Sequence, residues 1–116
     1  MRVAAWISLV LLGLGMLGAE ASSLKSIMRE MRATAREASA LSEGAFDAAT
    51  ARKLLETLAR ESEASAQAAG PSSRPRFAKF TADARGAAAS AQTGAQFKSA
   101  LATLVGECRS CHDATR

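Results

Sequence analysis

Apolar side chains recur at intervals of three and four residues in four separate stretches of the chain, which is the spacing of one face of an α-helix. The stretches span residues 24–41, 54–58, 77–91 and 97–111. Alanine is the commonest residue, and after residue 21 the chain contains a single isoleucine, Ile27, and a single valine, Val105. Alanine favours helices and β-branched residues favour strands. The sequence therefore predicts an all-α fold.

Three groups of helix-breaking residues separate these stretches. Ser42-Glu43-Gly44 follows the first stretch, the segment from Gly70 to Pro75 follows the second, and Thr93-Gly94 precedes the fourth. Thr93 and Gln96 have the spacing of a capping box at a helix start. Because the first and third connections are short, neighbouring helices are expected to run in opposite directions. We expect an antiparallel, up-down-up-down four-helix bundle.

Residues 1–21 have the pattern of a secretory signal peptide. Arg2 supplies a positive charge, Val3 to Leu17 form an apolar run that is short for a bilayer span, and Ala19-Glu20-Ala21 has the small residues of a cleavage site. We therefore expect cleavage after Ala21 and a single domain over residues 22–116, located in the periplasm without stable membrane insertion. Retention of the uncleaved segment as an amino-terminal anchor is the alternative.

The charge of the chain does not indicate a nucleic-acid partner. The formal net charge is +4, but basic and acidic residues alternate along the expected helices, as on solvated helix faces. After residue 21 the sequence contains no tryptophan and no tyrosine, so most of the side chains that stack on bases are missing. The single histidine also leaves no Ser/His/Asp arrangement. We expect no nucleic-acid binding and no enzymatic activity.

The only two cysteines and the only histidine lie together, as Cys108-Arg109-Ser110-Cys111-His112. This is the C-x-x-C-H pattern of covalent haem attachment. Cys108 and Cys111 are three residues apart and share one face of a helix, from which both thiols can bond the vinyl groups of one porphyrin edge. His112 can then coordinate the iron as its proximal axial ligand. We expect one covalently bound haem c.

Three other interpretations of this segment stay open. A disulfide in an oxidising compartment explains the cysteines and leaves the adjacent histidine to chance. A thioredoxin-like redox pair is expected where a strand enters a helix, whereas this segment ends a helix. A structural zinc site normally has four ligands, and the segment supplies three.

The predicted core is small for a bundle of four helices. Few large apolar side chains follow the signal peptide, and a domain of this size often needs additional stabilisation. A haem would add a large apolar body, and the alanines facing it would leave room for a flat macrocycle. Tight packing of alanine-rich helices without a cofactor is the alternative.

The carboxyl-terminal segment from Gly106 to His112, with Arg116 four residues later, resembles the attachment segment of the cytochrome c′ family. Members of this family are c-type cytochromes that fold as four-helix bundles. Met31-Arg32, with Leu41 ten residues after the methionine, is similar to the spacing in the low-spin members. In those members the methionine is the second axial ligand of the iron.

The expected topology leaves three possibilities for the sixth coordination position. The start of the first helix would lie beside the end of the fourth, so Met31 or Met28 could reach the iron, or neither could. A His112/Met31 iron suits electron transfer with redox partner proteins, whereas the resemblance implies that an open iron would bind NO or CO. A haem-free helical interaction domain is a third hypothesis, and homodimer formation stays open.

Overall fold

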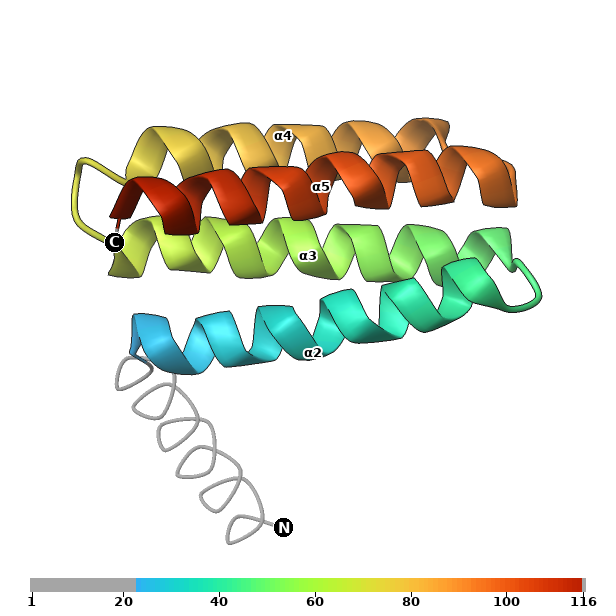
Figure 1. The fold of residues 1–116 in the computed structure, drawn as a ribbon, viewed down its shortest axis with the longest axis horizontal. Coiled ribbons are helices and arrows are strands. Elements are labelled where there is room, and N and C mark those ends of the chain that lie inside the picture. Colours follow the sequence, from blue (N-terminus) through green and yellow to red (C-terminus); the bar gives the residue numbers. More distant parts are fainter. Residues whose placement is uncertain (1–22, 116) are drawn as a thin grey trace, which may run out of the picture.

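The computed structural model describes residues 23–115, which form four α-helices and no β-strand (Figure 1). The helices are α2 (Leu24–Glu43), α3 (Ala48–Ala68), α4 (Arg74–Ser90) and α5 (Gly94–Thr115). The prediction of an all-α fold with four helices is therefore confirmed for residues 23–115. The predicted signal peptide and Arg116 lie outside the described residues. Within residues 23–115, no helix is both long enough and apolar enough to cross a membrane.

The four helices lie alongside one another, with their connections at the two ends (Figure 1). The α2–α3 connection is at one end, the α3–α4 connection is at the opposite end, and the last turns of α5 lie at the same end as the first turns of α2. The closest packing is between α3 and α4, whereas α2 and α5 meet only lightly. The helix that carries the methionines and the helix that carries the cysteines are therefore only lightly packed against each other.

Side-chain caps fix where three of the helices begin. The Ser26 N–H donates to Ser23 Oγ at 3.2 Å at the start of α2, and Asp47 caps α3 in the same way. At α5, the Gln96 N–H donates to Thr93 Oγ1 at 3.2 Å and the Thr93 N–H donates to Gln96 Oε1 at 3.2 Å. This reciprocal pair is the predicted capping box, which is confirmed.

Helix α4 begins at Arg74, inside the segment that the sequence indicated to be a connection. Pro75 occupies the second position of the helix. The N–H groups of the first turn have no acceptor within the helix, so a proline there sacrifices no hydrogen bond, and its fixed φ suits the helix. Pro75 is therefore accommodated in the first turn of α4, and the helix begins before it.

The core lies along the centre of the bundle and combines a few large side chains with alanines and serines. Phe97 and Leu55 are fully buried, and the ring of Phe46 lies 6.0 Å from that of Phe97. Ser62 and Ser65 are also fully buried. The remaining buried apolar residues of the core cluster are Met31, Ala38, Ala51, Leu58, Ala59, Phe80, Ala84, Ala88, Leu101 and Leu104.

Candidate functional site

The cysteines and the histidine of the C-x-x-C-H segment lie in the last turns of α5, where they line two adjoining cavities. Cys108 and Cys111 are half-buried, and His112 is exposed. The first cavity, of about 370 Å³, is lined mainly by α4 and α5, and the second, of about 500 Å³, is lined mainly by α2 and α5. Cys108 and His112 line both cavities, so the segment lies where the two meet.

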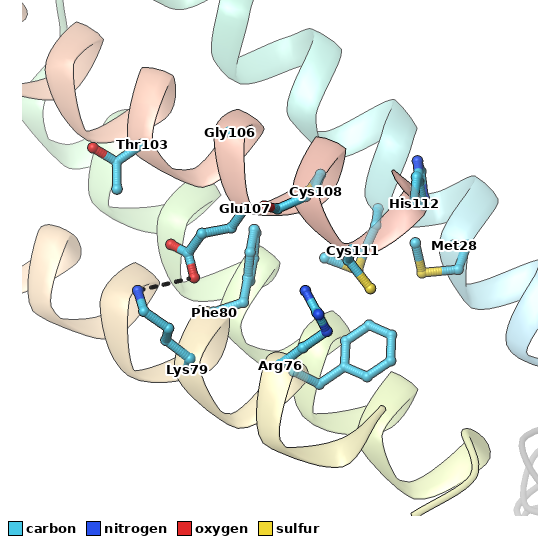
Figure 2. Close-up of a pocket in the computed structure, with 13 residues that line it drawn as sticks. Met28, Arg76, Lys79, Phe80, Thr103, Gly106, Glu107, Cys108, Cys111 and His112 are labelled. Atoms are coloured by element: carbon cyan, nitrogen blue, oxygen red, sulfur yellow. Dashed lines mark hydrogen bonds and ion pairs between the residues drawn. The ribbon is translucent and has the colours of Figure 1, made fainter. Parts of the chain in front are cut away.

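The structure brings the five predicted site residues to the same end of the bundle. Met28 and Met31 of α2 also line both cavities, together with Cys108 and His112, and Cys111 lines the first. Figure 2 shows Met28, Cys111 and His112 at one end of the first cavity. Met31 is the more deeply placed methionine, with 5% of its surface exposed, whereas Met28 is half-buried.

The walls of the second cavity join an apolar surface to a basic edge. Leucines, Val105 and Phe80 form the apolar part. Lys25, Arg29 and Arg32 line the same cavity from one face of α2, at spacings of four and three residues. A porphyrin has an apolar macrocycle and two carboxylate groups, and carboxylates pair well with arginine and lysine. The wall chemistry and the C-x-x-C-H donors therefore fit a haem.

Gly106 lines the first cavity two residues before Cys108. A Cβ atom at this position would meet no other atom within 4 Å, so neighbouring helices do not require a glycine there. A glycine inside a helix costs about 0.5–1 kcal/mol relative to alanine. Gly106 therefore leaves the wall of the first cavity without a side chain two residues before Cys108.

Ser65 lies directly beside both methionines, a contact that the apolar periodicity did not predict. Its hydroxyl donates to the Glu61 carbonyl at 2.8 Å, and its Oγ lies 3.7 Å from Met31 Sδ and 3.9 Å from Met28 Sδ. Ser65 is fully buried on α3. The signal was present in the spacing, because Leu55, Leu58, Ser62 and Ser65 follow one another at helical intervals on a single face.

An ion-pair cluster that includes Lys79 and Glu107 lies at the far end of the first cavity. Lys79 Nζ lies 3.4 Å from Glu107 Oε1 and 2.6 Å from Asp83 Oδ2, and Figure 2 shows the Lys79–Glu107 pair at the opposite end from His112. Burial raises the pKa of Glu107, and the neighbouring Asp83 carboxyl raises it further. Glu107 thus places a carboxyl with a weakened acidity next to Cys108.

The environment of Cys108 bears on the alternative of a reactive redox thiol. Burial raises the pKa of the Cys108 thiol, and the nearby Cys111 and Glu107 add to the shift. Reactive cysteines need the opposite shift, because the thiolate is the nucleophile.

The two sulfurs are not bonded to each other. Among residues 23–115, no three histidine, cysteine, aspartate or glutamate side chains are grouped to hold a metal ion by themselves.

No protein-family model matches the chain, and comparison with curated proteins and with solved structures gives no significant match. Function is therefore inferred from the residues of the site and their arrangement.

Proposed function

We propose that the protein is an exported mono-haem c-type cytochrome of the cytochrome c′ type, which transfers electrons in the periplasm. Cys108 and Cys111 would hold one haem c through thioether bonds. His112 would be the proximal ligand of the iron and Met31 the distal ligand, in an up-down-up-down bundle over residues 22–116. The partners would be redox proteins that donate and accept single electrons.

The observation that carries this proposal is the meeting of α5 and α2 at one end of the bundle. Cys108 and His112 line the same two cavities as Met28 and Met31. Histidine and methionine are a ligand pair found in electron-transferring c-type cytochromes, where the thioether raises the reduction potential. A C-x-x-C-H segment distant from both methionines would have left the electron-transfer proposal without a second ligand.

Each group of residues has a distinct task in the proposed reaction. The bound haem would supply the one-electron chemistry. The cysteines would keep it attached outside the cell, and the apolar walls, which include Phe80, Leu101 and Leu104, would exclude water from its faces. Lys25, Arg29 and Arg32 would pair with the propionates at the open edge.

A second function is supported by the apolar walls of the second cavity. If neither methionine bound the iron, this cavity would offer an apolar diatomic gas a water-poor route to the open coordination position. The protein would then bind NO or CO as a sensor or scavenger. The two proposals share the haem and the proximal His112, and they differ only in the sixth coordination position.

The visible spectrum of the haem-loaded ferrous protein, recorded before and after addition of CO, separates these functions. The electron-transfer proposal predicts a low-spin spectrum that CO changes little, together with reversible one-electron reduction. A high-spin spectrum that shifts at once with CO would replace electron transfer by gas binding.

A further inference from the structure

The sulfurs of both methionines of the site lie beside one buried hydroxyl. Met28 and Met31 are three residues apart on one face of α2, and both line both cavities beside Cys108 and His112. Their sulfurs lie 3.9 Å and 3.7 Å from Ser65 Oγ. The two thioethers therefore differ little in their distance from a common buried anchor.

We infer that the iron can take its sixth ligand from either Met31 or Met28, so that the second methionine replaces the first when the first is lost or displaced. This inference rests on the proposed function, since it concerns the distal ligand of the proposed haem. Ser65 is the common neighbour of both sulfurs and does not bind the haem itself.

Exchange between the methionines requires that a sulfur can leave Ser65 at low cost. The hydroxyl has one proton, and its nearest acceptor is the Glu61 carbonyl at 2.8 Å rather than either sulfur. Departure of one sulfur therefore leaves no polar group of Ser65 unsatisfied. Methionine is also unbranched and has three rotatable side-chain bonds, so its sulfur can move without displacement of the helix.

Burial determines which methionine serves first. Met31 is 5% exposed, so its thioether is already shielded from water, whereas Met28 is half-buried. Met31 is the resident ligand, and Met28 is the reserve. Two ligands on one helix face would keep the iron six-coordinate after oxidation of one methionine, an expected hazard outside the reducing cytoplasm.

The test compares four forms of the full-length, haem-loaded protein: wild type, Met28→Leu, Met31→Leu and the double variant. Leucine conserves apolar volume, so the bundle is expected to stay folded, and far-ultraviolet circular dichroism together with haem content checks this. The readouts are the ferrous spin state and the apparent affinity for CO. An iron that is open for only a fraction of the time binds CO more weakly by that fraction.

The inference predicts that both single variants stay low-spin and bind CO at least about tenfold more weakly than the double variant, which becomes high-spin. CO binding by Met31→Leu as tight as that of the double variant would overturn the inference and leave the His112/Met31 electron carrier intact. A double variant that stays low-spin would overturn it too, since a ligand other than methionine would then be present. A wild type that already binds CO as the double variant does would overturn both the inference and the proposed function.

Discussion

Gly86 and Gly106 are exposed glycines inside helices, and at neither position would a Cβ atom meet another atom within 4 Å. They differ in one respect, because Gly106 lines the first cavity and Gly86 does not. The pair therefore allows the cost of a helical glycine to be separated from its use at the site.

Replacement of either glycine by alanine is expected to raise the free energy of unfolding of the haem-free protein by about 0.5–1 kcal/mol. Only Gly106→Ala is expected to reduce the amount of haem incorporated, since its methyl group would enter the cavity beside Cys108. Denaturant unfolding and haem content per protein measure the two effects. Equal haem content in both variants would show that the bare backbone of Gly106 has no role in binding.

Glu61 is a second residue whose position predicts a measurable effect. Burial raises its pKa above the ordinary 4.5, and Oε1 is buried without a hydrogen-bond partner. Because the pKa of Glu61 is higher in the folded state than in the unfolded state, the protonated carboxyl stabilises the fold relative to the ionised one. The corresponding stability is fully present below the unfolded pKa and is lost as the pH rises through the folded pKa.

Glu61→Gln is therefore expected to be more stable than the wild type at pH 7, by less than about 1 kcal/mol because water screens this partly exposed group. The difference should disappear near pH 4. Urea unfolding at both pH values measures it, with Glu56→Gln on an exposed position of α3 as the control for loss of a charge. An advantage of equal size at both pH values would contradict burial as the cause.

At the scale of the elements, α5 begins at the capping box of Thr93 and Gln96 and carries the C-x-x-C-H segment at its other end. Thr93→Ala removes the acceptor of the Gln96 N–H bond, and we expect the free energy of unfolding to fall by about 1 kcal/mol. Thr103→Ala, at an exposed position of the same helix, should change it by less than about 0.5 kcal/mol. A similar loss of unfolding free energy in both variants would show that the capping box adds no stability beyond that of an ordinary exposed threonine.

The four helices and the cap at Thr93 could be predicted from the sequence because both depend on local spacing. The start of α4 could not, since Gly70 and Pro71 mark a connection while Pro75 sits within the first turn of the helix. The burial of Ser62 and Ser65 was also missed, because a search for apolar residues passes over small hydroxyl side chains. Ser62 is accommodated by donation to the Phe77 carbonyl at 2.9 Å, a partner on another helix that only the tertiary structure supplies.

For the candidate site too, the local features were predictable from the sequence and the tertiary ones were not. Adjacent residues defined the C-x-x-C-H segment, and the expected topology indicated that Met28 and Met31 would come near it. Their placement around Ser65 depends on how α2 packs against α3, which the spacing of residues within one helix does not reveal. The second cavity likewise lies between α2 and α5, which are far apart in the sequence and only lightly packed.

At the scale of the whole molecule, the proposed haem would also form part of the core. The contact between α2 and α5 is light, and the cavity between them is about 500 Å³. We therefore expect the haem-free protein to keep helical far-ultraviolet circular dichroism but to unfold on heating with weak cooperativity. The haem-loaded protein should unfold at a higher temperature in a sharper transition. A sharp transition that is independent of haem would show that the helices pack fully on their own.

The most direct test of the central claim is the mass of the protein under denaturing conditions. The full-length chain is produced in cells that contain the haem-maturation machinery, and the exported protein is purified from their periplasm. The proposal predicts the mass of residues 22–116 plus one haem that survives denaturation, and loss of that haem in the Cys108→Ser/Cys111→Ser double variant. A colourless wild-type protein, with the mass of the polypeptide alone, would contradict covalent haem attachment and leave a haem-free helical domain.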